Sequence, residues 1–152
     1  DNVDLIINLQ ADLPNIKPNS ISKLEKLMRE SNSPIGTLAS KLTKDEINDE
    51  NVVKVEVETD LKEDSFLKAK NFFRIKKDLK KEKIYHHVGI YCFQSSQLKK
   101  YVELGESRQE KILKLEQIRL MGKIEIKVGY CDSNPLSIDT LEDLKRIEKE
   151  MS

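Results

Sequence analysis

The chain has 152 residues, and its 27 Lys and Arg balance 27 Asp and Glu, so the formal net charge is zero. This length suits one domain with a core of its own and is short for two. A neutral chain has no overall field to gather nucleic acid or an anionic membrane, so neither partner is expected. No apolar run approaches the roughly 20 residues that cross a bilayer, and we expect no leader sequence.

The two cysteines, Cys92 and Cys131, lie in apolar stretches and have no close-spaced partner. Such thiols are expected to be buried and reduced, which fits a cytoplasmic protein. The chain opens at Asp1 and enters an apolar stretch within a few residues. We therefore expect it to start inside a longer sequence.

The first half of the chain alternates strand and helix patterns. Residues 3–9 form a nearly continuous apolar run, typical of a strand buried on both faces of a parallel sheet. Asn19 or Ser20 is expected to cap a helix whose apolar residues recur every three or four positions. Residues 35–39 indicate a brief strand, and residues 53–57 alternate apolar and charged side chains, so a mixed sheet is expected.

The second half begins with a charged stretch, residues 59–83, whose weak apolar pattern predicts a long solvated connection. Residues 85–93 are expected to form a strand, followed by a helix over about 95–104. A second helix is expected over about 107–121, with a strand over 124–130.

The terminal helix is expected to start near Thr140. Asp139 with Glu142, or Thr140 with Asp143, has the three-residue spacing of a capping box. Strands that alternate with helices predict an α/β fold, with helices on both faces of the sheet and ligand sites beyond the carboxyl ends of strands. We expect residues 1–152 to form a single domain.

Two aspartates lie where such a site would be. Asp12 follows the first predicted strand, and Asp139 precedes the last predicted helix. Each has an ordinary explanation, as a turn residue and as a helix cap respectively. If their loops meet, the two carboxylates could hold a hard cation such as Mg²⁺, which takes oxygen ligands.

The predicted strand 85–93 offers two polar groups on one face. Because side chains alternate along a strand, only one of His86 and His87 can face a given cleft, and Tyr91 shares the face of His87. This imidazole and phenol could hydrogen-bond one polyhydroxylated ligand, although an amphipathic edge of the core explains them equally. No Ser or Cys partner indicates nucleophilic catalysis, and no zinc-type ligand spacing is present.

Two other polar segments have a simpler interpretation as surface. Glu116 and Gln117 interrupt the apolar stripe of the predicted helix 107–121, as a solvated face would. The lysine-rich run at 76–83 contains acidic residues, which favours a solvated loop over a phosphate site. No glycine-rich phosphate loop occurs in the sequence.

Four motifs in register resemble those of the 3-deoxy-manno-octulosonate (KDO) cytidylyltransferases, which belong to the nucleotide-diphospho-sugar transferase relatives of the Rossmann fold. Residues 8–14, Asn-Leu-Gln-Ala-Asp-Leu-Pro, resemble the family's Asn-Val-Gln-Gly-Asp-Glu-Pro, and residues 85–91 contain its His-Xaa-Gly-Ile-Tyr. Residues 115–119, Leu-Glu-Gln-Ile-Arg, are similar to its Leu-Glu-Gln-Leu-Arg, and residues 138–144 to its Val-Asp-Thr-Pro-Glu-Asp-Leu. The resemblance covers nearly the whole chain.

The resemblance implies transfer of CMP from CTP to the anomeric hydroxyl of KDO, with release of pyrophosphate, for lipopolysaccharide synthesis. It implies a homodimer, and it implies that Asp12 and Asp139 hold a catalytic Mg²⁺. The residues that it assigns to the sugar-acid pocket are Gln10, His87, Tyr91, Glu116, Gln117 and Lys68.

The chain also departs from the family's pattern. Ala11 and Leu13 replace a Gly and a Glu beside Asp12, and an Ala would be strained there if φ were positive. Ser137 replaces a Gly, and Lys68 replaces an Arg whose bidentate fork a lysine cannot supply. The family's N-terminal strand and its loop of Arg, Ser, Arg and Lys, which hold CTP, have no counterpart, so this chain alone is expected to be inactive.

Two alternatives stay open. One is a cytidylyltransferase for another sugar acid such as sialic acid, although the Leu-Glu-Gln and His-Xaa-Gly-Ile-Tyr motifs favour KDO. The other is a non-catalytic sugar-binding or assembly module that has lost the nucleotide loop.

Overall fold

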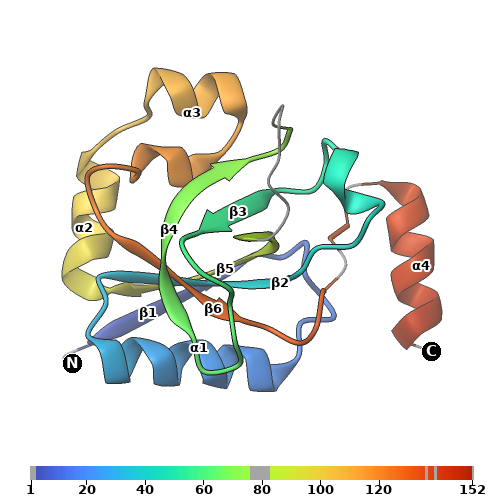
Figure 1. Ribbon diagram of the computed structural model, residues 1–152, viewed down its shortest axis with the longest axis horizontal. Coiled ribbons are helices and arrows are strands. Elements are labelled where there is room, and N and C mark those ends of the chain that lie inside the picture. The colour runs from blue at the N-terminus through green and yellow to red at the C-terminus, as the bar shows by residue number, and fades with distance from the viewer. Residues whose placement is uncertain (1–2, 76–82, 136, 139, 152) are drawn as a thin grey trace.

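The computed structural model describes residues 3–75, 83–135, 137–138 and 140–151, arranged as in Figure 1. Within these residues the strands join in one six-stranded sheet, in the order β1-β5-β2-β6-β4-β3. The strands are β1 (Leu5–Leu9), β2 (Ile35–Lys41), β3 (Lys54–Val57), β4 (Phe66–Phe73), β5 (Ile84–Gln94) and β6 (Ile126–Tyr130). The helices are α1 (Pro18–Ser31), α2 (Ser95–Glu103), α3 (Arg108–Leu113) and α4 (Leu141–Met151), with short 3₁₀ turns η1 (Glu46–Asn48) and η3 (Glu116–Arg119).

The sheet is mixed, as predicted. Strand β2 pairs with β6 in parallel, and the other pairings in the described part of the chain are antiparallel. The prediction that residues 3–9 form a parallel strand buried on both faces is wrong. Strand β1 pairs antiparallel with β5 at the edge of the described sheet, and Leu9 is exposed. An apolar run predicts that side chains are buried, but it does not predict whether the strand runs parallel or antiparallel to its neighbour.

Strand β5 holds the sheet together, because it pairs with β1, β2 and β3. Strand β3 also pairs with β4, and β4 with β6, so β5, β2, β6, β4 and β3 close into a curl. Figure 1 shows β4 curving across β6 and β2 toward β3. Apolar side chains fill the inside of this curl, among them Ala39, Val55, Phe72 and Val128.

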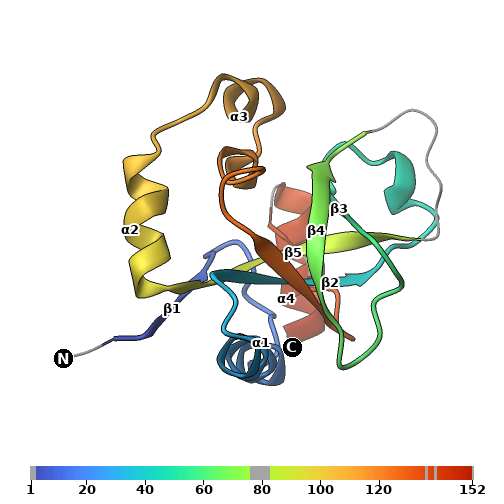
Figure 2. The same ribbon diagram turned by 60° about the vertical axis from the view of Figure 1, so that its left-hand side comes forward.

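Helices cover both faces of the sheet, as predicted. In Figure 2, α1 lies on one side, with α2 and α3 on the other. Leu24 and Met28 of α1 are buried in a cluster with Leu38 and Val88 of the sheet. On the other side, apolar residues of α2 and of the α3–η3 segment pack against the inside of the curl, including Leu98, Tyr101, Leu115 and Leu120.

Helix α1 begins differently from the prediction. It starts at Pro18 with Lys17 at the N-cap, and no side chain caps it, so the predicted cap by Asn19 or Ser20 is wrong. Proline suits the first helical position because its φ is already helical and its missing N–H has no partner there. Pro18 therefore marks the start of the helix.

The predicted solvated connection over 59–83 is wrong in its middle, where β4 lies. Residues 76–82 lie outside the described part of the chain. The ladder between β3 and β4 skips one residue, since Glu56 pairs with Asn71 and Val57 with Ala69. This bulge brings both Ala69 and Phe72 into the core, three positions apart, and so interrupts the period of two that predicts a strand.

The predicted helix over 107–121 is two shorter elements. Helix α3 ends where Lys114 adopts a left-handed conformation, with φ of 51°, and η3 follows. The change of direction lets Leu115 and Leu120 enter the core, whereas Ile112, predicted for the apolar stripe, is 67% exposed. A left-handed lysine is uncommon, and this sequence has no glycine there to indicate the break.

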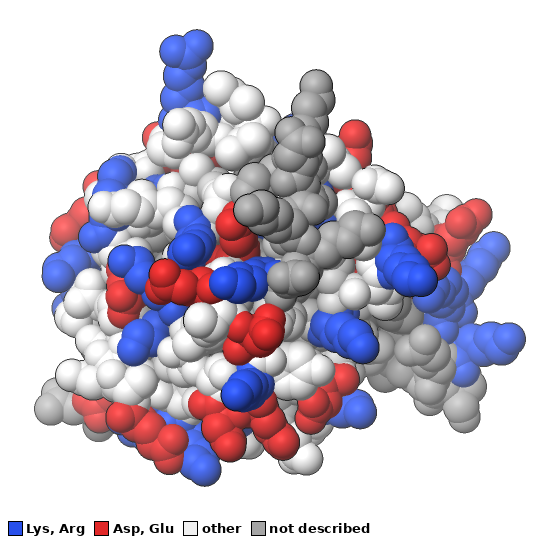
Figure 3. Space-filling model, viewed as in Figure 1, with Lys and Arg blue, Asp and Glu red and all other residues white. Residues whose placement is uncertain are grey.

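Acidic and basic side chains are interspersed on the face drawn in Figure 3. This mixing matches the balanced composition, and the charged residues drawn there form no continuous cationic surface of the kind that binds nucleic acid. In the described residues no helix combines the length and the apolar character needed to cross a membrane.

Replacing Gly36 with Ala should destabilise the fold. A Cβ at this position would lie 2.6 Å from Met28 Sδ, 2.8 Å from Phe66 Cζ and 3.1 Å from Leu24 Cδ1, so α1 and β4 would have to move apart. Overpacking of this kind costs about 1–3 kcal/mol of unfolding free energy, measurable by urea denaturation. Gly89→Ala is the control, because its nearest contact would be the flexible end of Gln10. Equal losses in both variants would contradict this explanation.

Candidate functional site

The loop after β1 presents Gln10 and Asp12 at the end of the sheet. Two backbone hydrogen bonds shape this loop, from Leu13 N to Gln10 O at 3.3 Å and from Ile16 N to Leu13 O at 3.3 Å. Leu13 is buried in the cluster beneath α1, so this departure from the family's Glu anchors the loop in the core. In the described residues, positive φ outside glycine occurs at Asn32 and Lys114, so the strain considered for Ala11 is absent.

The loop that follows β6 meets the loop that follows β1. The N–H of Ile138 donates to the carbonyl of Asp12 at 3.0 Å, and the Ser137 hydroxyl lies 3.4 Å from Asp12 Oδ2. The other carboxylate oxygen, Asp12 Oδ1, is buried and has no hydrogen-bond partner in the described residues. Ser137 thus makes a contact with the carboxylate that the family's Gly could not make.

Asp139 itself lies outside the described residues, but both of its neighbours are described. Thr140 forms a capping box with Asp143: Thr140 N donates to Asp143 Oδ2 at 2.9 Å, and Asp143 N donates to Thr140 Oγ1 at 3.2 Å. This is one of the two predicted capping boxes. The other, Asp139 with Glu142, lies outside the described residues.

His87 and Tyr91 lie on one face of β5, as predicted. Both are buried, their ring centroids are 5.4 Å apart, and Phe72 packs edge-on against His87 at 5.2 Å. Gly89 lies between them in β5. A Cβ on Gly89 would lie 2.8 Å from Gln10 Oε1, so the Gln10 side chain occupies the space over this glycine. The structure thereby brings Gln10 beside the strand segment that bears His87 and Tyr91.

Thr37 determines how His87 presents its imidazole, and sequence reasoning missed it. The Thr37 hydroxyl lies 2.7 Å from the carbonyl of Ile90 and 3.0 Å from His87 Nε2. Its single proton is donated to the carbonyl, so its oxygen accepts from Nε2–H of the ring, and Nδ1 is left as an acceptor. Burial lowers the pKa of His87 to about 3, so the ring is neutral at physiological pH.

Tyr91 supplies a buried hydroxyl group. Its oxygen has no hydrogen-bond partner in the described residues. Burial first, and then the negative charge of Glu116, raise the pKa of Tyr91, so the phenol stays protonated and can donate. A buried donor without a partner is costly, and a bound ligand would satisfy it.

Glu116 and Gln117 lie in η3. Gln117 is buried, contrary to its interpretation as surface, whereas Glu116 is exposed yet close enough to affect the pKa of Tyr91. Arg119, which the sequence reading did not single out, holds η3 in place. Its Nε donates to Glu110 Oε2 at 2.9 Å, and its guanidinium lies 4.8 Å from the centroid of the Tyr101 ring.

Lys68 is not brought to this group. It is exposed in β4, between Leu67 and Ala69, which both pack in the core cluster that contains Tyr91. Because side chains alternate, Lys68 points away from that cluster, and it pairs in the ladder with Lys127 of β6. The structure therefore gives its assignment to the sugar-acid pocket no support.

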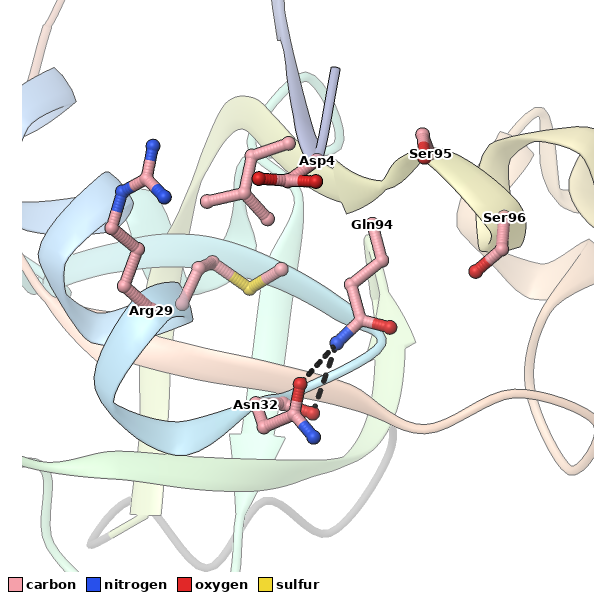
Figure 4. A pocket seen from close by; sticks show the side chains of 8 residues that line it. Asp4, Arg29, Asn32, Gln94, Ser95 and Ser96 are labelled. Carbon is pink, nitrogen blue, oxygen red and sulfur yellow. Dashed lines mark hydrogen bonds between the residues drawn. The ribbon is translucent and has the colours of Figure 1, made fainter. Parts of the chain in front are cut away.

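A cavity of about 450 Å³ lies at the other end of β5 and is distinct from these residues. Figure 4 shows its lining, where Gln94 Nε2 donates to Asn32 Oδ1 at 2.9 Å and to Asn32 O at 3.1 Å. None of the predicted site residues that the structure describes lines it. Its lining residues are Asp4, Leu5, Met28, Arg29, Asn32, Gln94, Ser95 and Ser96.

The chain is similar to known proteins over most of its length. A family described as "Cytidylyltransferase" matches residues 1–127. The 3-deoxy-manno-octulosonate cytidylyltransferase of Bartonella quintana (strain Toulouse) is 39% identical over 146 residues, which are 95% of this chain and 59% of that protein. The protein of the same name from Brucella ovis is 36% identical over 146 residues, 95% of this chain and 58% of that protein.

Solved structures agree. A CMP:2-keto-3-deoxy-manno-octonic acid synthetase complexed with CTP superposes with a TM-score of 0.83 at 29% identity, over 99% of this chain and 63% of that one. A UTP-bound UGPase from Acinetobacter baumannii has a TM-score of 0.63 at 13% identity, over 97% of this chain and 48% of that one.

The fold is therefore of the nucleotidyltransferase type. The chain belongs to the cytidylyltransferase family, and the predicted resemblance to the KDO cytidylyltransferases is confirmed. It spans about three fifths of the length of the curated relatives that it matches.

The neutral state of His87 predicts a pH dependence of stability. Its folded pKa is about 3, below its ordinary value of 6.5, so the unfolded chain binds the extra proton first as the pH falls. The stabilisation is complete above pH 6.5 and is lost as the pH falls toward 3, by at most about 1.4 kcal/mol per pH unit.

Comparison of wild type with His87→Gln isolates this effect from the titration of carboxylates. In urea unfolding at pH 7, 6 and 5, the wild type should lose stability relative to the variant at each step. Parallel pH profiles would show that His87 is not held neutral by burial.

Proposed function

We propose that this chain forms the sugar-acid pocket and the metal-binding loops of an enzyme that transfers CMP from CTP to KDO and releases pyrophosphate. The observation that carries the proposal is the meeting of the two strand-end loops at Asp12, where a buried carboxylate oxygen has no partner among the described residues. The KDO cytidylyltransferases named above support the reaction, and the solved relative complexed with CTP supports the nucleotide.

Asp12 fits a ligand of Mg²⁺. Its Oδ1 is buried and unpartnered within the described residues, and its Oδ2 is held by Ser137. No group of three or more His, Cys, Asp or Glu gathers in the part of the chain that the structure describes. Mg²⁺ does not require one, because it commonly uses one or two carboxylates, several waters and substrate phosphates. Asp139, one residue beyond Ile138, would be the second carboxylate.

The metal would supply charge neutralisation at the phosphate oxygens. The chain's own residues would bind and orient the sugar acid. Neutral His87 offers Nδ1 to accept a hydrogen bond from a sugar hydroxyl, and the protonated phenol of Tyr91 donates one. Gln10 and Gln117 have amides that can do both. Fixed dipoles in a buried pocket cost little reorganisation when the anomeric oxygen attacks the α-phosphorus.

We expect the 152 residues by themselves not to turn over. The sequence has no glycine-rich phosphate loop, and the Arg, Ser, Arg and Lys loop of the resembling family has no counterpart in it. Homodimerisation and a cytoplasmic location remain predictions of the resemblance and of the two free, buried cysteines.

Calorimetric titration tests the proposal. The chain should bind KDO in the presence of Mg²⁺, and CTP should bind weakly or not at all. Asp12→Asn should weaken binding of the metal at least about tenfold, because it removes one charged ligand. Asp64→Asn, at an exposed turn, is the matched control and should behave as wild type.

The same titration separates the alternatives. Tighter binding of sialic acid than of KDO would assign the chain to a different sugar acid. Binding of KDO that neither Mg²⁺ nor Asp12→Asn affects would indicate a sugar-binding module without catalytic metal. If neither sugar acid binds to a chain that circular dichroism shows to be folded, the proposed pocket is wrong.

A further inference from the structure

A polar cluster lies on the face of β5 opposite to His87. Its members are Glu46 of η1, His86 of β5 and Asn134 in the loop after β6. Glu46 Oε1 lies 3.0 Å from His86 Nδ1 and 2.8 Å from Asn134 Nδ2. A carboxylate oxygen can only accept, so His86 donates from Nδ1 and Asn134 donates from its amide. One oxygen atom thus joins three segments that are far apart in the sequence.

Glu46 is held in position by contacts outside the cluster. The side chains of His86 and Glu46 are 17% and 18% exposed. The second carboxylate oxygen, Oε2, accepts from Thr43 N at 2.8 Å, which holds Glu46 in place. Lys54 is fully buried, and its Nζ donates to the carbonyls of Asp49 and Arg74, which holds the chain just after η1 against β4. These contacts keep the Glu46 carboxylate in place, so its bond to Asn134 can hold the loop that follows β6.

The loop attached at Asn134 is the one that leads to the second carboxylate. It leaves β6 with Cys131 N donating to Ala39 O at 2.8 Å. Further along the loop, the amide of Asn134 donates a hydrogen bond to Glu46. Ile138 N then donates one to the carbonyl of Asp12. Asn134 is thus an attachment between the end of the sheet and the contact with Asp12, next to Ser133, whose hydroxyl lies 3.3 Å from Ser20 Oγ of α1.

We propose that Glu46, His86 and Asn134 position the chain segment that carries Ile138, and thereby hold its contact with the loop of Asp12, the proposed metal ligand. This inference rests on the metal site of the proposed function. None of the three residues touches Asp12 in the described structure, so they act through the loop and not on the metal. His86 and His87 then serve opposite faces of the sheet, one for the loop and one for the sugar acid.

Amide hydrogen exchange by NMR tests the positioning without any metal. Asn134→Ala and Glu46→Ala should raise the exchange rate of the Ile138 amide about fivefold or more, on the order of one lost hydrogen bond. The Cys131 amide is the internal control, because its bond to Ala39 lies in the sheet, and its rate should not change. Glu46→Gln keeps the oxygen shared by His86 and Asn134 but loses the bond from Thr43 N, and so should raise the Ile138 exchange rate less than Glu46→Ala does.

Titration with Mn²⁺ completes the test, on the wild type, the three variants above and Asp12→Asn. Asn134→Ala and Glu46→Ala should weaken Mn²⁺ binding about three- to tenfold, and Glu46→Gln should weaken it less. If Asp12→Asn binds Mn²⁺ as wild type does, the proposed metal site is wrong and this inference falls with it. If Asp12→Asn loses binding while the two alanine variants keep both wild-type affinity and slow Ile138 exchange, only the positioning role is overturned.

Discussion

The hydroxyl group of Thr37 lies at the break in the ladder between β2 and β5, and the arrangement of the site depends on it. Thr37 pairs with Tyr91 and Leu38 with Val88, so two residues of β5 are extra at this point. Thr37 Oγ1 fills the break by contacting the carbonyls of Val88 and Ile90 and the ring of His87. Such a bulge bends a strand. The bend lets one half of β5 pair with β1 and the other half with β3.

The same break in the ladder determines which side chains of β5 lie together at the candidate site. His87 and Tyr91 lie on either side of it, both buried, and Gly89 between them leaves room for Gln10. Burial keeps the imidazole neutral and the phenol protonated, so these two side chains offer neutral hydrogen bonds in a region of low dielectric. Charge is concentrated instead at Asp12, on the adjoining loop. The proposed substrate, a sugar acid that carries hydroxyl groups and a carboxylate, fits this division between neutral groups and the proposed cation site.

Much of the fold could be predicted because its strands and helices keep their periods. The strands at 35–41, 84–94 and 126–130 and the helices at 95–103 and 141–151 follow the expected pattern closely. The failures coincide with local departures from regular geometry. The bulge in the β3–β4 ladder interrupts the alternation of side chains in β4, so the sequence pattern did not predict this strand. The left-handed conformation of Lys114 divides the predicted helix in two. Neither departure has a glycine or proline to indicate it.

The candidate site likewise contains residues that the sequence could identify and residues that it could not. The motif residues were identifiable because they lie in segments that resemble the family's motifs: Gln10 and Asp12 follow a strand, and His87 and Tyr91 share one face of a strand. Their supports were not, since Thr37 is an ordinary strand residue and the bond between Ile138 and Asp12 joins backbone atoms. Asn134 is a loop asparagine with no pattern around it. Contacts between segments far apart in the sequence depend on the closed curl of the sheet, which no local pattern encodes.

Anomalous X-ray scattering from crystals grown with Mn²⁺ tests the central claim most directly, because Mn²⁺ accepts the oxygen ligands that Mg²⁺ prefers. The account predicts a peak within about 2.3 Å of Asp12 Oδ1, between the loop after β1 and the loop that precedes α4. Crystals in which Asp12 Oδ1 is bonded only to protein donors, with no peak beside it, would contradict the claim that these two loops form a metal site.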